Sequence, residues 1–444
     1  MTNVDARSEP ADAGSDRSPA HPPQHPARPP EPTGSSALRL ALLVGSVVLL
    51  GLWAGLSALV VVLAIVVMIF LHELGHFVTA RAAGMKCTEF FIGFGPRIWS
   101  FTRGETEYGI KAIPAGAYVK VIGMTNLDEV DPADESRTYR EKPYWRRMSV
   151  AVAGSTMHFL IALLVMFVYF AAVGAPEDDN WEVGYLAGPE ASSVSPAEEA
   201  GLDVGDRIVA IDGTPLVTFE DLQDVMSDHR PGETVAVTVN RDGQAVERRV
   251  DLAESGDGGA FLGIGAYHPP QRLSLPSAAG RTATEFAEVS RLTVEAIGRI
   301  FSPSGISNFL GMAVDTAQTD DPDAPASDET DIEGQGDRVL SIYGAARLGT
   351  QMTDSGPAGL LLFLALINIF IGIFNLVPLL PLDGGHVAIA TYERVRELLS
   401  RSKARYHADV GKLIPLTYAV VFVLVGIGLV ALYLDIASPL ELPN

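Results

Sequence analysis

The stretch MIFLHELGHFVTARAAGM, residues Met68–Met85, ends a long apolar run with two histidines and a glutamate. His72 and His76 are four positions apart, so on a helix both imidazoles leave one face, one turn apart, as two ligands of one zinc ion require. Glu73 would lie beside the metal, where it can accept a proton from water. We therefore expect a catalytic metal site at this end of the run.

The location of the motif supports this prediction, because HExxH alone occurs by chance in many soluble helices. Ionisable side chains at the edge of a membrane span are costly unless they meet a partner inside the protein, and a divalent metal is such a partner. The alternative is an ordinary interfacial helix in which residues 72–76 lie just outside the bilayer.

The composition indicates an integral membrane protein with soluble parts. Of 444 residues, 48% are hydrophobic, and they gather in blocks long enough to span a bilayer. The single cysteine, Cys87, excludes an intramolecular disulfide and a cysteine-cluster metal site, so any zinc must be held by histidine and carboxylate. The net charge of -22 comes mainly from the middle of the chain and argues against nucleic acid as a partner there.

Apolar blocks and composition shifts divide the chain into ten segments. In the N-terminal part we expect a disordered tail over 1–36, an extra transmembrane helix over 37–56, a transmembrane helix with HELGH over 57–83 and short strand-like runs over 84–148. The central part is expected to contain a transmembrane helix over 149–174, a small α+β domain over 182–267 and a linker with a helix and an acidic loop over 268–356. A transmembrane helix over 357–390, a basic loop over 391–413 and a transmembrane helix over 414–435 would complete the chain. One long tilted helix is the alternative to the first two spans.

Basic residues near the spans predict their orientation, since short loops rich in Lys and Arg tend to stay cytoplasmic. The runs RAAGMK, EKPYWRRMS and YERVRELLSRSKARYHADVGK all fall on one side if the spans alternate. We expect that side to be the cytoplasm of a cell whose inner (cytoplasmic) membrane holds the protein. The acidic stretch over about 175–356 would then lie outside.

A catalytic zinc needs a third protein ligand and keeps one position open for water. The candidate is Asp383, a lone carboxylate ending another uncharged span in NIFIGIFNLVPLLPLDGGHV, residues 368–387. The alternating topology brings it to the same side as the HELGH motif. Pro378 and Gly384 would break the helix there, and irregular backbone is tolerated at membrane depth only where it lines a protein cavity. The alternative is a turn leaving the membrane, with Asp383 solvated.

Residues 182–267 have the element order of a small α+β domain. In VSPAEEAGLDVGDRIVAIDGTPLVTFEDLQDVM, residues 194–226, a helix start and a Gly-Leu stop precede an alternating strand and an Asp-Gly turn. ETVAVTVNRDGQAVERRVDLA, residues 233–253, predicts two strands about an Asp-Gly hairpin. This order resembles a PDZ domain of the bacterial, circularly permuted kind.

Together these motifs resemble the bacterial site-2 protease family, which are intramembrane zinc metalloproteases. HELGH, FIGFGPRIWS, GETEYGIKAIPAGAYVKVIGM, the PDZ-like segment and FNLVPLLPLDGGH occur in the family's order over residues 65–434. The resemblance implies an α-helical multi-span membrane protein with an inserted extracytoplasmic α+β PDZ-like domain. It also implies single-span substrates in the lipid bilayer, such as anti-sigma factors or remnant signal peptides.

The resemblance assigns roles to five residues. Zinc would be bound by His72, His76 and Asp383. Glu73 would be the catalytic base. Asn375 would contact the substrate backbone or the oxyanion near the scissile bond; its alternative role is an amide hydrogen-bonded between packed helices. The resemblance also implies that the region over 84–148 forms a membrane-associated β-hairpin, which presents a strand edge to an unwound substrate. The alternative is a plain cytoplasmic β-loop.

The chain departs from the family where a Gly-Pro-x-x-Asn pattern usually opens the next span. Here AGSTMH places Ser155 for the proline and His158 for the asparagine. The role of the asparagine cannot be transferred, and His158 is either a polar group near the metal or a helix-packing histidine. His386, in the DGGH motif, is expected to be structural.

Three functions remain open on sequence grounds. The first is hydrolysis of a peptide bond in or near a transmembrane segment. The second is a non-enzymatic membrane scaffold whose PDZ-like domain binds peptide termini, with a purely structural metal. The third is a zinc protease acting on soluble peptides at the membrane face.

Overall fold

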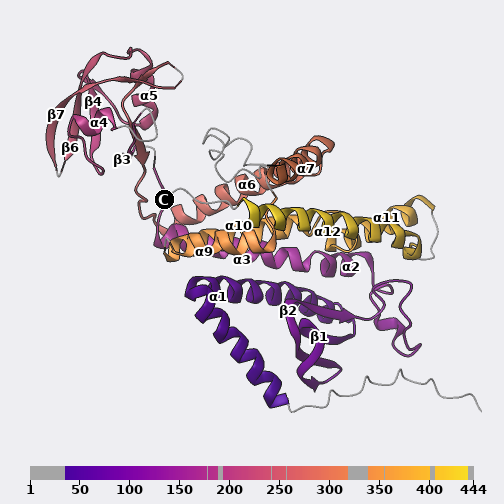
Figure 1. The fold of residues 1–444 in the computed structure, drawn as a ribbon. Coiled ribbons are helices and arrows are strands. Elements are labelled where there is room, and N and C mark those ends of the chain that lie inside the picture. Colours follow the sequence, from indigo (N-terminus) through magenta and orange to yellow (C-terminus); the bar gives the residue numbers. More distant parts are fainter. Residues whose placement is uncertain are drawn as a thin grey trace, which may run out of the picture.

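The computed structural model describes residues 36–177, 179–188, 194–241, 243–256, 258–318, 339–354, 356–400 and 406–438. Residues 1–35 of the predicted tail and the acidic loop over 319–337 lie outside this part of the chain. Helices lie side by side in a layer, and a small strand-rich domain projects from one end of it (Figure 1). Helices α2 and α11 lie toward the opposite end.

The first helix, α1 Ser36–Ala82, consists of two arms joined at a kink (Figure 1). Gly55 breaks the helix with φ 88° and ψ 168°, a conformation that glycine adopts at little cost because it lacks Cβ. The kink falls within GLWAGLS, residues 51–57, where the sequence indicated a junction between two spans. The second arm carries the HELGH motif.

Four helices are long and apolar enough to cross a membrane. They comprise Gly51–Ala82, Ala153–Ala172, Pro357–Phe374 and Val410–Ala437. Within the described residues, the extra span expected over 37–56 is the first arm of α1 and is not a separate candidate. The chain is therefore a membrane protein with at least four apolar helices.

The centre of the helical layer is formed by α3 Ala153–Ala172 and α10 Pro357–Phe374, which pack against each other and against α6 Leu275–Ile300. Their shared core contains Ala162 and Ile369, both fully buried. The region over 268–356, where one helix was expected, also holds α7 Pro303–Gln318 and α9 Ile342–Asp354, and both contact α12 Ile414–Ala437.

The segment over 357–390, expected as one transmembrane segment with irregular backbone near Pro378 and Gly384, is divided into two helices. Helix α10 ends at Phe374, and α11 Asp383–Ser400 begins at the candidate ligand. Pro378 and Pro381 cannot supply the backbone N–H groups that a continuous helix requires. Helix α11 also occupies the first part of the loop expected over 391–413, and η2 Val410–Leu413 occupies its end.

The turn between these helices folds back tightly on the start of α11. The amide of Gly384 donates a 2.7 Å hydrogen bond to the carbonyl of Asn375. A Cβ atom at position 384 would lie 2.2 Å from the carbonyl oxygen of Val377, so only glycine fits this approach. The glycine that follows Asp383 thereby fixes where α11 starts.

The strand-like runs after α1 form a long hairpin of β1 Cys87–Arg103 and β2 Thr106–Val121. Phe90 is a register partner of both Tyr108 and Val119, so the first part of β1 lies between two parts of β2. The hairpin contacts α1, and η1 Glu135–Arg137 and α2 Tyr144–Ala151 lead from it to α3.

The projecting domain extends from β3 Glu182–Leu186 to β10 Ile264–Tyr267, which pair with each other. Its other elements are α4 Pro196–Glu199, β4 Arg207–Ile211, β5 Thr214–Pro215, α5 Phe219–Ser227, β6 Thr234–Arg241, β7 Gln244–Asp251, β8 Ala253–Glu254 and β9 Ala260–Phe261. A four-stranded sheet of order β5-β4-β6-β7 covers a core that includes Trp181 and Val237. The hairpin predicted about Gly243 is β6 and β7.

Candidate metal centre and active site

Three candidate ligands meet at one point, although they come from distant parts of the chain. Nε2 of His76 lies 3.2 Å from Nε2 of His72 and 3.2 Å from Oδ2 of Asp383. Nε2 of His72 is 3.5 Å from the same carboxylate oxygen. His72 is buried, and the other two side chains are largely shielded. The second arm of α1 and the first residue of α11 therefore supply one convergent set of donor atoms.

This donor set has the chemistry and spacing that a tetrahedral zinc site requires. Nδ1 of His76 donates a 2.8 Å hydrogen bond to the carbonyl of Val150, which can only accept, so a neutral ring presents the lone pair of Nε2 to the cluster. Zinc bonds of about 2.0–2.1 Å at tetrahedral angles place donor atoms about 3.4 Å apart. The observed separations of 3.2–3.5 Å fit that value.

Glu73 lies beside the three donors without joining them. Its Oε1 atom is 4.0 Å from Nε2 of His72, and its carboxylate lies against the backbone amide of Val119 in β2. The cluster of convergent ligand atoms contains only His72, His76 and Asp383 among the described residues. Glu73 is thus placed to exchange a proton near the metal position while leaving the ligand set intact.

Helix α3 closes one side of the cluster through Gly154, which the sequence interpretation did not single out. A Cβ atom at this position would lie 2.2 Å from Cε1 of His72 and 2.5 Å from Nε2 of His76. The missing side chain therefore leaves room for the imidazoles and for whatever they bind. The sequence could have pointed to Gly154, because this residue stands in AGSTMH directly before Ser155, one of the residues that depart from the family pattern.

Substituting Gly154 by alanine should weaken metal binding. The added methyl group cannot fit beside His72 and His76 unless the rings move, so we expect the Gly154→Ala variant to bind zinc at least about tenfold more weakly, as loss of an orienting contact does. Gly426→Ala is a matched control, because nothing lies within 4 Å of a Cβ there. Chelator competition on the purified variants measures the difference, and equal zinc affinity would contradict this role for Gly154.

Asn375 caps the C-terminal end of α10, eight positions before Asp383. Its backbone carbonyl accepts the hydrogen bond from Gly384, but within the described part of the chain its side-chain amide makes no hydrogen bond. The alternative role, an amide bonded between packed helices, is instead filled by Asn368. The Asn375 amide remains available for a ligand.

His158 is buried in α3 and faces the cluster from the side. Asn368 uses its Nδ2 group to donate to the carbonyl of Leu364 at 2.7 Å, so its Oδ1 atom accepts from Nδ1 of His158 at 2.9 Å. The ring of His158 lies 4.9 Å from the ring of His72. His158 therefore joins α3 to α10 and packs on a candidate ligand, outside the ligand set itself.

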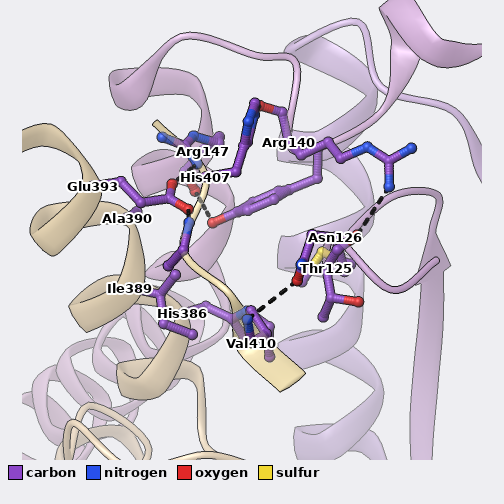
Figure 2. A pocket seen from close by; sticks show the side chains of 13 residues that line it. Thr125, Asn126, Arg140, Arg147, His386, Ile389, Ala390, Glu393, His407 and Val410 are labelled. Atoms are coloured by element: carbon purple, nitrogen blue, oxygen red, sulfur yellow. Dashed lines mark hydrogen bonds and ion pairs between the residues drawn. The ribbon is translucent and has the colours of Figure 1, made fainter. Parts of the chain in front are cut away.

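A buried ion pair holds α11, and with it Asp383, against the rest of the helical layer. The guanidinium of Arg147 in α2 pairs with Glu393, which also accepts a 2.6 Å hydrogen bond from the amide of Ala408 (Figure 2). Tyr139 donates to the carbonyl of Arg147 at 3.3 Å. Buried charges are tolerated only when they are paired and hydrogen-bonded in this way. The pair fixes α11 about three turns after its first residue.

His386 and Cys87, which the sequence analysis did not assign to the site, lie outside the metal centre. His386 lines the small cavity of about 20 Å³ beside this ion pair, and its ring lies 6.4 Å from the ring of Tyr139 (Figure 2). Its structural role is consistent with that position. Cys87 is buried at the start of β1, and burial raises the pKa of its thiol to about 11, so it supplies no thiolate at neutral pH.

Comparisons with known proteins identify the family. Residues 60–417 match peptidase family M50. Zinc metalloprotease Rip1 of Mycobacterium tuberculosis is 32% identical over 413 residues, which cover 86% of this chain and 97% of that protein. Zinc metalloprotease Rip1 of Mycolicibacterium smegmatis is 33% identical over 426 residues, which cover 87% and 99%.

Among solved structures, the PDZ domain of an SdrC-like protein from Listeria monocytogenes aligns with 20% of this chain and 87% of its own, at 21% identity and a TM-score of 0.17. That likeness is too low to support an argument, whereas the family match covers most of the chain. The protein belongs to peptidase family M50, the site-2 proteases, and is a zinc metalloendopeptidase of the membrane.

Proposed function

We propose that this protease hydrolyses a peptide bond in or near the transmembrane segment of a single-span membrane protein, at a zinc ion held by His72, His76 and Asp383. One observation carries the proposal. The donor atoms of His72 and His76 come from one membrane-length apolar helix, and that of Asp383 comes from the turn that follows a second one. An unpaired carboxylate and two imidazoles would otherwise be costly there. A soluble protease has no need to place its site there.

The chemistry would divide between the metal and Glu73. Bound zinc supplies Lewis acidity, which polarises the scissile carbonyl and lowers the pKa of water. Glu73 takes the proton from the attacking water and passes it to the departing amine, which is general base and then general acid catalysis. The carboxylate is suited to both steps because it lies near His72 without being one of the three donors.

The hairpin of β1 and β2 could hold the substrate's scissile bond in an extended conformation. A peptide bond inside a helix is shielded, so the substrate must be extended before cleavage, and strand addition holds it by main-chain hydrogen bonds. The last part of β2, which contains Val119, lies next to Glu73 and pairs with β1 along one edge. A substrate strand added beside it would run past the metal centre, with the Asn375 amide free to contact its backbone or the oxyanion.

The basic connections favour an inner-membrane protein with its catalytic centre toward the cytoplasm and its PDZ-like domain outside. Substrates would be single-span proteins such as anti-sigma factors or remnant signal peptides, embedded in the lipid bilayer. The PDZ-like domain would act as a filter that keeps bulky outer domains from the site. It projects away from the helical layer and contributes no residue to the donor cluster (Figure 1).

Deletion of the PDZ-like domain distinguishes the protease function from the scaffold function. Glu182 and Tyr267 are register partners, so residues 182–267 can be replaced by a short linker without stretching the chain. We expect this variant to cleave a substrate whose outer domain has been removed, and to cleave the full-length substrate at least as well as the wild type. A cleavage assay on both substrates in detergent measures this.

The scaffold alternative predicts the opposite pattern for two variants. If the protein works by holding peptide termini, the deletion should remove its function, and Glu73→Gln should leave it intact. Loss of cleavage of the trimmed substrate, with the deletion variant still folded and zinc-loaded, would count against the filter.

A further inference from the structure

An open groove of about 630 Å³ lies where the end of α1 meets the turn of the hairpin. It is lined by Arg81, Phe101, Arg103, Gly104 and Tyr108. Arg81 is in the last turn of α1, and Arg103 ends β1. Neither guanidinium forms an ion pair with any residue that the structure describes. The groove therefore carries two cationic side chains whose charge is not neutralised by direct contact.

The carboxylates nearest to the groove are already engaged by other arginines. Glu105, in the hairpin turn, accepts two hydrogen bonds of 2.6 Å from Arg137. Glu107 accepts from Arg97 at 2.5 Å and from Ser100 at 2.7 Å. The direct contacts of these acids go to other side chains, and Glu105 acts on Arg81 only through its charge.

Two aromatic rings that line the groove, those of Phe101 and Tyr108, belong to a longer row of rings that continues past it. Centroid distances along the row are 5.8 Å from Phe77 to Tyr108, 5.4 Å from Tyr108 to Phe101 and 5.1 Å from Phe101 to Trp99. The guanidinium of Arg81 lies 5.6 Å from the ring of Phe77. Phe101 and Trp99 are 46% and 44% exposed, so the row offers an apolar surface that the chain itself leaves uncovered.

The groove lies at the end of an apolar span. The apolar span that carries HELGH ends at Ala82, directly after Arg81. Aromatic residues favour the membrane–water interface, and arginines just beyond a span attract anionic lipids of the cytoplasmic leaflet. A guanidinium also matches the geometry of a phosphate better than an ammonium does.

We infer that this groove binds the anionic headgroup of a phospholipid, with the phosphate between Arg81 and Arg103 and an acyl chain along Phe101 and Trp99. The exposed rings favour a lipid over a free phosphate ion, which has no apolar part to cover them. No residue of the groove is a donor of the metal centre, so a test of lipid binding is independent of a test of the proposed cleavage reaction. A lipid held here would anchor the hairpin at the membrane surface.

Native mass spectrometry of the full-length protein in detergent tests the inference. The probes are dioleoylphosphatidylglycerol, which is anionic, and dioleoylphosphatidylcholine, which has the same chains and no net charge. We expect the wild type to retain one phosphatidylglycerol in preference to phosphatidylcholine. Arg81→Gln/Arg103→Gln should weaken phosphatidylglycerol binding by roughly thirtyfold, because each cation near a membrane surface contributes a factor of about five.

The matched control removes the same charge elsewhere on the basic side of the protein. Arg394 and Lys412 each pair with an acid of their own segment and do not line the groove. Arg394→Gln/Lys412→Gln should change phosphatidylglycerol binding less than twofold. If the double groove variant does not fold, Arg103→Gln alone, on the exposed hairpin turn, should still weaken binding about fivefold.

Four results would overturn the inference. Equal retention of the two lipids by the wild type would exclude an anionic headgroup site. An equal loss in the control variant would indicate general attraction to charge. Displacement of the lipid by millimolar inorganic phosphate would indicate a free-phosphate site. Displacement by a soluble acidic peptide, with no preference between the lipids, would indicate a peptide site.

Discussion

Glu73→Gln is expected to lower the rate of peptide-bond cleavage by at least about 10²- to 10⁴-fold, the usual contribution of a general acid–base group, while one zinc ion per chain is retained. The amide has the size of the carboxylate and can still lie against the amide of Val119, so the surroundings keep their shape. It cannot accept the proton from water at neutral pH. The zinc ligands are unaffected, because Glu73 lies outside the donor cluster.

Cleavage of a purified single-span test substrate and elemental analysis of the same preparation measure the two quantities together. Glu220→Gln, at an exposed position of α5 in the projecting strand-rich domain, removes one carboxylate of the same type from an element that contributes nothing to the donor cluster, and it should cleave normally. Cleavage by Glu73→Gln at the wild-type rate would show that another group is the base.

Asp383→Ala is expected to abolish both zinc binding and peptide-bond cleavage. The Oδ2 atom of Asp383 is within 3.5 Å of both histidine nitrogens, so its loss leaves only two donors on one helix. Loss of a group that merely orients a ligand costs about 10- to 100-fold in metal affinity, and loss of a ligand itself should cost more. Zinc affinity should therefore fall by more than about 100-fold.

Chelator competition measures this affinity, and the residual cleavage rate should be at background. Asp224→Ala, at an exposed position of α5, is the control for loss of an aspartate. Unchanged zinc content in Asp383→Ala would mean that Asp383 is a solvated turn residue, as the alternative interpretation of the LDGG motif proposed.

The pairing of the HELGH and LDGG motifs could be predicted because both rest on local chemistry. Two histidines four positions apart on a helix must share a face, and a lone carboxylate at the end of an uncharged span needs a partner. The hairpin of β6 and β7 was readable for a similar reason, since an Asp-Gly turn such as the one ending at Gly243 marks a hairpin directly.

Features that depend on helix packing were not readable. Gly154 resembles any small residue in an apolar helix, and its closeness to the imidazoles exists only because α3 packs against α1. The ion pair of Arg147 and Glu393 joins residues 246 positions apart. Arg81 and Arg103 share a groove because the hairpin folds back toward α1.

The break between α10 and α11 shows a limit of a different kind. The prolines and glycines of the LDGG region indicated irregular backbone, yet the apolar run continues far enough to suggest one helix over 357–390. The structure starts α11 at Asp383 because the close contact at Gly384 turns the chain there. Hydropathy locates the span but does not locate its end.

The central claim, cleavage at membrane depth by a zinc site built on His72, His76 and Asp383, is tested most directly by mapping the cut. A single-span substrate is incubated with the zinc-loaded protein in detergent, and mass spectrometry of the products identifies the cleaved bond. We expect the cut inside the substrate's apolar segment or at its cytoplasmic edge, and no cut at that bond with Glu73→Gln. A cut confined to a soluble region away from the span, or one that persists in Glu73→Gln, would contradict the claim.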